Sequence, residues 1–385
     1  MARHAKRRLL FEDDATGSAP RAAPLFQPDR IILTRGCGAT PDRARLVEGI
    51  CRAYPDAEVL DRADLSHNQV DLACDRPLDR HRVGKRTLVL GEHKSAVRFS
   101  SERLNCCPNY WHFSPYGFCP YGCTYCYLAG TRGVWFSPTV KIFLNLDEML
   151  GRIDRIARRA ARPTAFYLGK LQDGLAMDLL SGYSRRMIPF FAGHPFARLV
   201  VLTKSSHVGN LLALRPEGRT VLSWSLSTMD VWRRYEPGTP SPAERLEAMR
   251  LCAQAGYRIR AVVMPIVPVG PWRQAYDQLL EELLATVPVE RITLGGICSF
   301  PNAMRLMNDK LGDGNEINRL LSSGQRSADG RRRFRPALRV ECYRHVLESI
   351  RNSRPDLTVG LCMEERETFR QLRLDANIGK CNCVL

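Results

Sequence analysis

The chain has 385 residues, of which 44% are hydrophobic and 25% are charged. It has no apolar run long enough to cross a bilayer, and basic residues 1–8 are not followed by the apolar stretch of a signal peptide. We therefore expect a cytoplasmic protein without a membrane partner. Its 57 Lys and Arg residues against 40 Asp and Glu give a net charge of +17, which favours a nucleic acid partner, with arginine bias from a GC-rich genome as the alternative. The 14 cysteines lack an export context, so we expect metal ligands, catalytic thiols or core residues rather than disulfides.

The N-terminal quarter predicts a small α/β unit. Residues 1–26 lack periodicity, and we expect them to form a basic mobile arm. The periodic segments that follow are three strands and one helix, at 30–34, 58–60, 86–91 and 41–54. We therefore place an N-terminal α/β unit at 27–100.

From Tyr110 onward the pattern alternates between strand and helix. The six expected strands lie at 110–113, 165–168, 199–203, 221–226, 260–264 and 291–294. A helix with an apolar stripe is expected at 146–162, and Ser241–Glu244 has the pattern of a capping box before another helix. This alternation predicts a parallel sheet, open or barrel-like, with chemistry at the carboxyl ends of its strands. We assign 101–300 to this partial barrel and 301–385 to a C-terminal region.

One short loop carries three cysteines, Cys119, Cys123 and Cys126, spaced C-x3-C-x2-C. Three thiolates on such a loop can ligate three irons of a [4Fe–4S] cubane and leave the fourth iron open. The open iron can bind the amino and carboxylate groups of S-adenosylmethionine, whose reductive cleavage gives a 5′-deoxyadenosyl radical. A zinc site is the alternative, but zinc commonly takes four ligands in paired C-x2-C units, and this motif supplies one such pair.

Further motifs recur in order along the chain. They are Ser66–Val70, Arg82–Gly91, Cys123–Leu128, Val201–Lys204, Ser223–Ser225, Tyr235–Thr239 and Met264–Ile266 with Trp272. In these motifs the sequence resembles the spore photoproduct lyase family, radical enzymes that reverse a thymine–thymine lesion in DNA. The resemblance extends from about residue 30 to about residue 365. It implies an incomplete (β/α)6 TIM-type radical SAM barrel, with a [4Fe–4S] cluster and S-adenosylmethionine as cofactors.

The resemblance also assigns cofactor contacts by position. Tyr125 matches an aromatic residue beside the adenine, Lys204 a lysine that contacts the cofactor carboxylate, and Ser225 a hydroxyl that contacts ribose or methionine. Met264 matches the residue that backs the adenine, and Tyr127 matches a tyrosine near the radical path. The alternatives are a surface lysine, an inward serine and ordinary core packing.

A basic run near the C-terminus matches the β-hairpin with which the family touches DNA. It consists of Arg331, Arg332, Arg333, Phe334 and Arg335. The arginines would contact phosphates, and the phenylalanine would stack on or wedge beside a base. A solvated charge run is the alternative. DNA carrying a pyrimidine lesion is thus the expected partner and substrate.

One departure from the family affects the mechanism. The family carries a hydrogen-donating cysteine in a Cys-Thr-Ser-Asp run, whereas the matching run here starts with Lys170 and ends with Asp173. These two residues become candidate contacts to the cofactor or to a phosphate. Cys381 and Cys383 in the tail are candidates for a replacement hydrogen donor or, with Cys362, for a second metal centre.

The sequence therefore predicts a radical SAM lyase with a C-terminal basic hairpin and a cysteine-containing tail. We expect a monomer that takes electrons from a reducing partner such as flavodoxin or ferredoxin. One alternative keeps the radical chemistry but acts on RNA, a peptide or a metabolite, as the missing cysteine suggests. Another is a non-catalytic iron–sulfur protein that binds nucleic acid, against which Lys204 and Ser225 argue.

Overall fold

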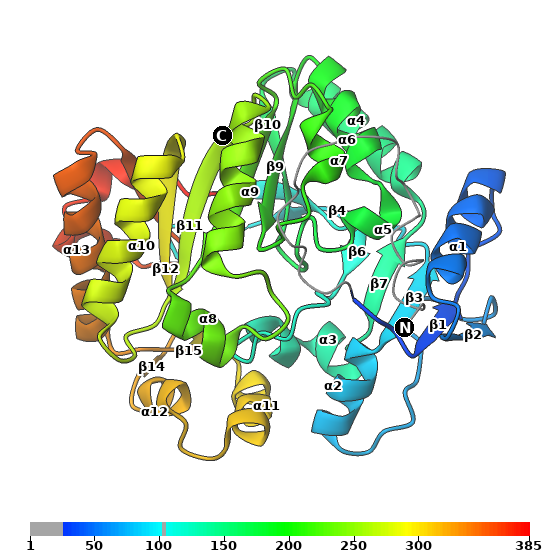
Figure 1. Cartoon of the computed structure of the whole chain (residues 1–385), viewed down its shortest axis with the longest axis horizontal. Coiled ribbons are helices and arrows are strands. Elements are labelled where there is room, and N and C mark those ends of the chain that lie inside the picture. The colour runs from blue at the N-terminus through cyan, green and yellow to red at the C-terminus, as the bar shows by residue number, and fades with distance from the viewer. Residues whose placement is uncertain (1–25, 102–104) are drawn as a thin grey trace, which may run out of the picture.

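A computed structural model describes residues 26–101 and 105–385. The predicted basic arm lies, up to residue 25, outside the described residues. The described part contains three β-sheets of eight, five and three strands. Figure 1 shows the large sheet with its covering helices as the main body of the molecule and the five-stranded sheet beside it.

The secondary structure alternates strands and helices over most of the chain. The described strands are β1 (Arg30–Leu33), β2 (Glu58–Asp61), β3 (Thr87–Gly91), β4 (Val97–Ser100), β5 (Tyr110–Phe113), β6 (Tyr116–Gly117), β7 (Val140–Phe143), β8 (Thr164–Leu168), β9 (Ala197–Thr203), β10 (Thr220–Leu226), β11 (Arg258–Ile266), β12 (Val289–Gly296), β13 (Cys298–Ser299), β14 (Gln325–Arg326), β15 (Arg332–Arg333) and β16 (Thr358–Leu361). The described helices are α1 (Pro41–Ala53), α2 (Pro77–Lys85), α3 (Arg132–Phe136), α4 (Leu146–Ala160), α5 (Asp178–Ser181), α6 (Ser184–Gly193), α7 (Gly209–Leu212), α8 (Met229–Tyr235), α9 (Pro242–Gln254), α10 (Trp272–Thr286), α11 (Pro301–Leu311), α12 (Glu316–Ser322), α13 (Pro336–Ser353) and α14 (Arg366–Gln371), with 3-10 turns η2 (Tyr127–Gly130) and η3 (Asp375–Asn377).

The large sheet has the order β16-β12-β11-β10-β9-β8-β5-β4. All neighbours are parallel except β4, which pairs antiparallel with β5 at one edge. The six strands expected from the sequence are all present, with ends within two residues of those predicted. The α/β class is therefore confirmed. The sequence missed β16, a four-residue strand that contains Gly360 and extends the parallel sheet at its other edge.

The five-stranded sheet has the order β2-β1-β3-β7-β6, parallel except for β6. Its strands interleave with those of the large sheet along the chain. After β3, the chain supplies β4 and β5 to the large sheet, returns to the small sheet with β6 and β7, and then enters the large sheet again at β8. The expected division at residue 100 thus falls between strands of one sheet, and the domain boundaries stay predictions.

Helix faces explain how the sheet is covered. The apolar stripe of α4 is buried, with Leu146, Met149, Leu150, Ile153 and Ala157 all facing inward. Helix α9 begins with the expected capping box, in which the Ser241 hydroxyl accepts from Glu244 N at 3.2 Å and the Glu244 carboxylate accepts from Ser241 N at 2.7 Å. Within residues 26–101 and 105–385, no helix combines the length and apolarity needed to cross a bilayer.

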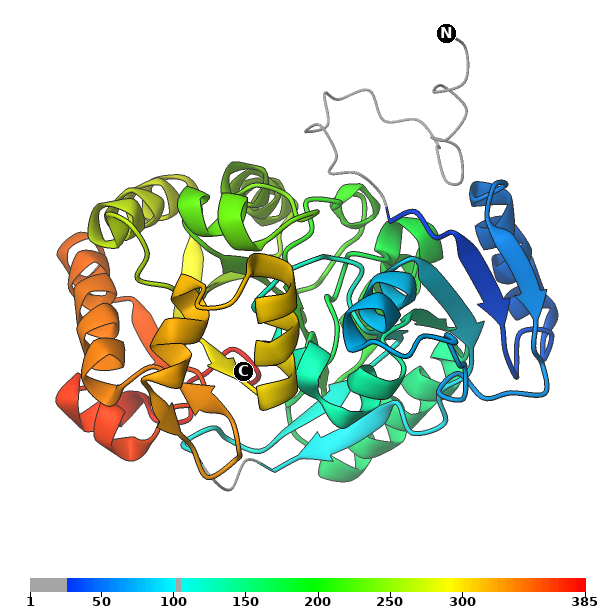
Figure 2. The same cartoon turned by 90° about the horizontal axis from the view of Figure 1, so that it is seen from below.

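The C-terminal region adds a small antiparallel sheet, β13-β15-β14. Its β14–β15 hairpin carries part of the basic run, as expected. The chain then passes through α13 and β16, and its last residues return to the large sheet. Figure 2 shows the C-terminal end within the outline of that sheet, and Cys383 packs beside Tyr110, Tyr167, Val200 and Val221, from four of its strands.

Candidate functional site

The three-cysteine loop lies between β6 and η2 and packs against the segment that follows α8. Backbone hydrogen bonds join Gly122 N to Pro237 O at 3.0 Å and Thr124 N to Tyr235 O at 2.9 Å. A Cβ at Gly122 would lie 3.0 Å from Pro237 O. A glycine at this position therefore lets the two backbones approach, which fixes the loop against the C-terminal side of β10.

A half-buried cation from the N-terminal part of the chain holds the other side of the loop. The Lys85 ammonium, at the end of α2, donates to the carbonyl oxygens of Cys119 and Tyr121, the latter at 2.6 Å. It also lies 3.8 Å from the ring centroid of Phe118. Burial lowers the pKa of Lys85, while the nearby thiols oppose that shift. The cation stabilises a loop whose carbonyls would otherwise lack donors.

The three thiols suit a polynuclear cluster better than a single metal ion. All three are free and partly buried, and burial raises the pKa of Cys123 to about 11. Over the described residues, no three His, Cys, Asp or Glu side chains converge closely enough to hold one ion. In a cubane each thiolate binds a different iron, so its ligands need not converge on one point. The three thiols therefore match the ligand set of a [4Fe–4S] cluster and are one short of the four ligands common at a structural zinc site.

Next to the loop lies a buried charged network that includes two of the expected cofactor contacts. The Tyr125 hydroxyl and an Arg245 guanidinium nitrogen both donate to Glu236, and Lys204 Nζ lies 3.9 Å from Glu236 Oε1. The Glu236 and Arg245 side chains are fully buried. Burial alone would raise the pKa of Glu236, but Lys204 and Arg245 outweigh it and lower that pKa to about 2. The network thus fixes a positive charge, Lys204 Nζ, 5.7 Å from the centroid of the Tyr125 ring.

Asp173 shapes the strand end that presents Lys204. Its carboxylate accepts from Thr203 Oγ1 at 2.6 Å, Lys204 N at 2.7 Å, and the amides of Leu175 and Ala176 at 3.0 and 2.9 Å. With both oxygens engaged by the protein, Asp173 acts as a positioning residue in this conformation. The expected direct cofactor contact would require it to give up one of these bonds.

Lys170 also lies at the carboxyl end of β8. Its ammonium donates to Ser100 Oγ and lies 5.1 Å from the ring centroid of Tyr110. Ser225, on β10, donates to Met264 O at 2.8 Å. A Cβ at Gly295 would lie 2.6 Å from Met264 Sδ, so the glycine makes room for the thioether against β12. Ser225 and Met264 are therefore paired through adjacent strands, as their expected shared pocket requires.

Three side chains of the basic run have partners within the protein. Phe334 is 1% exposed and packs in an apolar cluster with Met307 and Leu321. Arg331 and Arg333 are buried and bind Asp329, at 2.6 and 3.0 Å. In this conformation the protein itself uses these side chains, so a base wedge by Phe334 or phosphate contacts by Arg331 and Arg333 would require them to leave their present partners.

The rest of the basic run lies nearer to solvent. Arg332 is half-buried and donates to Ser322 O at 3.2 Å, and Arg335 is exposed. Arg331 also lies over Tyr127, with its guanidinium carbon 5.7 Å from the ring centroid, and burial raises the pKa of Tyr127. The hairpin thus connects to the cluster loop through Tyr127, while Arg332 and Arg335 are its remaining candidates for DNA contact.

The tail cysteines belong to a group of thiols that we call the thiol quartet: Cys107, Cys362 and Cys383, which are half-buried, and Cys381, which is buried. Side-chain hydrogen bonds link Cys107 to Cys362 and Cys381, and Cys381 to Cys383. Cys383 reaches Tyr167, whose pKa is raised by burial and then by Cys383. The four thiols, all among the described residues, lack the convergent geometry of a single-ion site, which disfavours the second metal centre in that form.

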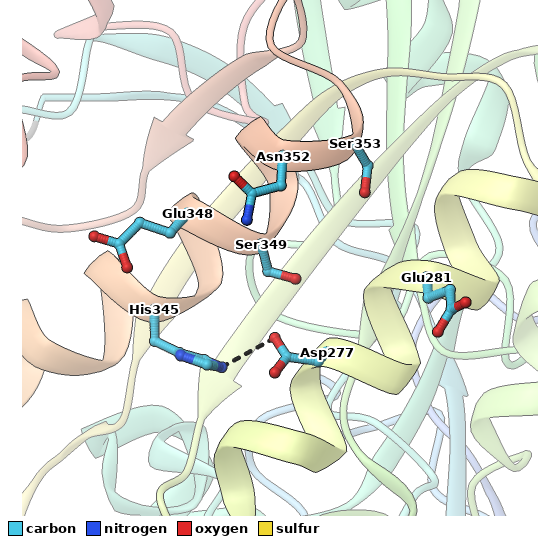
Figure 3. A pocket seen from close by; sticks show the side chains of 7 residues that line it. All are labelled: Asp277, Glu281, His345, Glu348, Ser349, Asn352 and Ser353. Atoms are coloured by element: carbon cyan, nitrogen blue, oxygen red, sulfur yellow. Dashed lines mark ion pairs between the residues drawn. The ribbon is translucent and has the colours of Figure 1, made fainter.

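A surface cavity of about 430 Å³ lies between α10 and α13. Figure 3 shows His345 on α13 directed at Asp277 on α10, with Glu348 on α13 and Glu281 on α10 at opposite sides of the cavity. The His345 ring nitrogen lies 3.0 Å from the Asp277 carboxylate. Neither the cluster loop nor the expected cofactor contacts line it. It therefore belongs to the outer helical layer and not to the candidate site.

Sequence reasoning missed three site residues, and a signal existed for two of them. Lys85 lies in the Arg82–Gly91 motif and Glu236 in the Tyr235–Thr239 motif, but neither was assigned a role. Arg245 lies near the start of α9, where nothing in the local pattern separates it from a surface arginine.

The family was tested by comparison with known proteins. The model of the spore photoproduct lyase family matches residues 28–294. The chain belongs to the spore photoproduct lyase family. This confirms the resemblance that was drawn from the ordered motifs.

Two curated members of the family are similar to the chain over part of their length. Spore photoproduct lyase from Geobacillus sp. (strain Y412MC61) is 33% identical over 225 residues, 58% of this chain and 64% of that protein. The protein from Bacillus subtilis (strain 168) is 32% identical over 230 residues, 59% of this chain and 65% of that protein. The matches thus span less than two thirds of these relatives.

Solved structures of spore photoproduct lyase share the fold over a longer span. One complexed with dinucleoside spore photoproduct has a TM-score of 0.76 at 24% identity, covering 88% of this chain and 100% of that chain. A doubly substituted mutant with bound AdoMet and dinucleoside spore photoproduct has a TM-score of 0.75, also at 24% identity, covering 87% and 99%. The family fold therefore extends to the region beyond residue 294.

Proposed function

We propose that this protein is a radical S-adenosylmethionine lyase that acts on pyrimidine lesions in DNA. One observation carries the proposal. The three-cysteine loop lies against a buried Lys204–Glu236 pair at the carboxyl end of a parallel sheet, where α/β enzymes bind their ligands. The strand order is consistent with an incomplete (β/α)6 barrel, which β16 extends by one parallel strand.

The chain's own residues would bind and orient the cofactor. Cys119, Cys123 and Cys126 would hold a [4Fe–4S] cluster, which supplies the electron that cleaves S-adenosylmethionine. Lys204 would pair with the cofactor carboxylate, since its side chain is a mostly enclosed cation that keeps an exposed fraction of 16%. Tyr125 would pack beside the adenine.

Ser225 would contribute a hydroxyl to the cofactor pocket, and Met264 would back the adenine. The Ser225 hydroxyl donates to the Met264 carbonyl, so its oxygen can still accept from a ribose or amino group. Because this bond fixes the side chain, Ser225 would be oriented before the cofactor arrives.

A DNA substrate is supported by family membership, by the net charge of +17 and by the neighbouring structures with a dinucleoside lesion. Arg332 and Arg335 are the members of the basic run placed to contact phosphates. Lys170, at the carboxyl end of β8, would bind a phosphate or the cofactor carboxylate. Tyr127 would lie on the radical path, since it joins the cluster loop to the hairpin.

The thiol quartet would replace the family's hydrogen-donating cysteine. Cys383 contacts Tyr167 inside the large sheet, and Cys381 is hydrogen-bonded to Cys383. A thiol here can give its S–H hydrogen atom to a substrate radical, and the thiyl radical left behind can be shared within the quartet. In deuterated water, Cys383→Ser should lower deuterium incorporation into repaired DNA, while Cys74→Ser, a half-buried cysteine elsewhere, should not.

We further propose a monomeric enzyme with an N-terminal α/β unit at about 27–100, a partial barrel at about 101–300 and a C-terminal region beyond. A flavodoxin or ferredoxin would supply the electron in the cytoplasm, since the proposed chemistry needs a one-electron donor. The basic surface implied by the net charge suits an acidic redox partner as well as DNA.

The decisive experiment is anaerobic reconstitution with iron and sulfide, dithionite reduction, and incubation with S-adenosylmethionine and ultraviolet-irradiated DNA. We expect 5′-deoxyadenosine to form and lesions to decline, with both lost in Cys123→Ala and retained in Cys74→Ala. Formation of 5′-deoxyadenosine while the lesions persist would show that the enzyme acts on another substrate, such as RNA, a peptide or a metabolite. No 5′-deoxyadenosine under any condition would leave a non-catalytic iron–sulfur protein.

A further inference from the structure

A second cavity, of about 350 Å³, lies at the carboxyl edge of the five-stranded sheet. Arg35 follows the end of β1, Glu92 follows the end of β3, and His67 comes from the loop after β2. Strands β2, β1, β3 and β7 are parallel, so their carboxyl ends meet at this edge. Open parallel sheets bind ligands at this edge, and the first three residues of the Ser66–Val70 motif, Ser66, His67 and Asn68, line the cavity.

The wall of the cavity carries more positive than negative charge. Arg35, Lys94 and Arg98 line it, against a single carboxylate, Glu92. That carboxylate is partly neutralised, because Glu92 Oε2 lies 3.6 Å from a nitrogen of the buried Arg43, and its Oε1 lies 3.5 Å from Lys94 Nζ. An anion entering the cavity would thus meet a net attraction.

The cavity is also built on constrained backbone. A Cβ at Gly91 would lie 2.1 Å from Thr34 Oγ1, so the close approach of the ends of β1 and β3 requires glycine. The loop after β3 is fixed by Asn145, whose Oδ1 accepts from His93 N at 2.9 Å. Arg98 donates to Ser95 Oγ at 2.7 Å, which holds its guanidinium at the rim. A guanidinium held in this way loses less side-chain entropy on binding than a free one.

We propose that this cavity is a phosphate-binding site, taking either a backbone phosphate of DNA or the phosphate of a free nucleotide. Arg98 offers planar N–H donors that suit a phosphate, and Lys94 adds a mobile charge whose side chain is 79% exposed. In the first case the site rests on the proposed DNA substrate and adds a second contact to it, outside the radical centre. In the second case the site is independent of that function.

The test compares two charge-matched double variants of the full chain in its cluster-reconstituted form. Lys94→Gln/Arg98→Gln removes two cations from the cavity, and Arg152→Gln/Arg159→Gln removes two exposed cations from α4. Thermal shift with inorganic phosphate and with thymidine monophosphate reports small-anion binding. Fluorescence anisotropy with duplex DNA, from about 50 to about 300 mM salt, reports the number of phosphate contacts. No cofactor or reductant is added, so the result does not depend on radical chemistry.

We expect the phosphate-induced shift to disappear in the cavity variant and to persist in the α4 variant. If the site holds DNA, the cavity variant also loses about tenfold or more in affinity, and its salt slope falls by roughly 2, since each contact contributes about 0.9. If only the small-anion shifts are lost, the phosphate belongs to a free nucleotide. If the two variants behave alike in both measurements, the proposal is overturned.

Discussion

Lys85 shows how one residue links the small sheet to the candidate cluster site. It extends from α2, donates to two carbonyls of the cysteine loop and lies over Phe118. A fixed positive charge beside a cluster favours the state with more electrons, because reduction adds negative charge there. Its place inside the Arg82–Gly91 motif is consistent with such an influence.

Replacing Lys85 by Met should therefore make the cluster harder to reduce. We expect a more negative reduction midpoint and poorer iron retention after reconstitution, because the loop loses both a charge and two hydrogen bonds. Spectroelectrochemical titration of the cluster absorbance measures the first effect, and iron analysis the second. Lys380→Met, at an exposed lysine in the tail, should leave both unchanged. An unchanged midpoint in Lys85→Met would contradict the electrostatic argument.

Glu236 is the negative centre of the buried network, and its replacement should reveal how much that charge stabilises the fold. Glu236→Gln leaves Lys204 and Arg245 without their partner, which costs about 3–5 kcal/mol for buried pairs. Glu316→Gln, in a partly exposed pair with Arg234, should cost about 1 kcal/mol or less. Urea denaturation at neutral pH measures both. Equal losses in the two variants would contradict a buried network.

The same carboxylate predicts a pH dependence. Its folded pKa, about 2, lies below the ordinary value of 4.5, so its contribution is complete above the unfolded pKa and is lost as pH falls toward the folded one. The free-energy gap between the wild type and Glu236→Gln should therefore shrink between about pH 5 and about pH 3. Denaturation curves over this range check the sign, and a gap that widens in acid would contradict it.

At the scale of elements, the basic hairpin region contains side chains of two kinds: Phe334 packs in the interior and stabilises the fold, whereas Arg335 is exposed and is a candidate for DNA contact. Phe334→Ala should lower stability by about 3–5 kcal/mol, because it empties a packed apolar site. Arg335→Gln should leave stability unchanged and reduce the salt slope of DNA binding by about 0.9. Denaturation and anisotropy on the same two variants give the result. A large loss of DNA affinity in folded Phe334→Leu, with normal stability, would support the base-wedge prediction.

The hairpin also shows that long-range contacts, unlike secondary structure, could not be predicted from the sequence. The elements with strong periodicity were predicted, including the six central strands and the capping box of Ser241, because those signals are local. An arginine's exposure is not local. Arg333 donates to Met363 O, thirty residues away in sequence, at 2.6 Å. No pattern within the basic run predicts that partner. Strand β16 was missed for a similar reason, since its pairing with β12 is what makes four residues a strand.

The residues of the candidate site also divide into those that have a local sequence signal and those that are brought together only by folding. Cysteine spacing identified the cluster loop from the sequence, because three ligands on one loop constitute a local pattern. Lys204 was assigned through the family resemblance, by its place in the Val201–Lys204 motif. The Glu236–Arg245 pair was not found, because it forms only when α9 packs beside the segment after α8.

At the scale of the whole molecule, the tail acts as an internal support for the large sheet. Arg260, on β11, donates to Val384 O at 2.5 Å, Arg291, on β12, to Cys381 O at 3.0 Å, and Ser223, on β10, to Asn382 Oδ1 at 2.7 Å. The tail thus supplies acceptors to polar side chains that three adjacent strands turn inward.

Removing residues 381–385 should therefore destabilise the fold. Each buried donor left without an acceptor costs about 1–3 kcal/mol, so we expect a loss of several kcal/mol in urea denaturation. Cys381→Ala/Cys383→Ala keeps the backbone carbonyls and should lose much less. Equal stability of the truncated chain and the double variant would show that the tail backbone does not stabilise the large sheet.

The interleaving of the two sheets has a consequence for the inheritance and engineering of this fold. The chain enters the large sheet at β4, returns to the small one at β6 and leaves it again after β7. No single cut through the described residues yields either sheet as a contiguous cassette. A single crossover after β7 exchanges the small sheet only together with β4, β5 and the cysteine loop, and a shortened gene that omits the small sheet also loses these segments. Insertions at surface turns, which leave both sheets whole, are the changes that such a chain can accept.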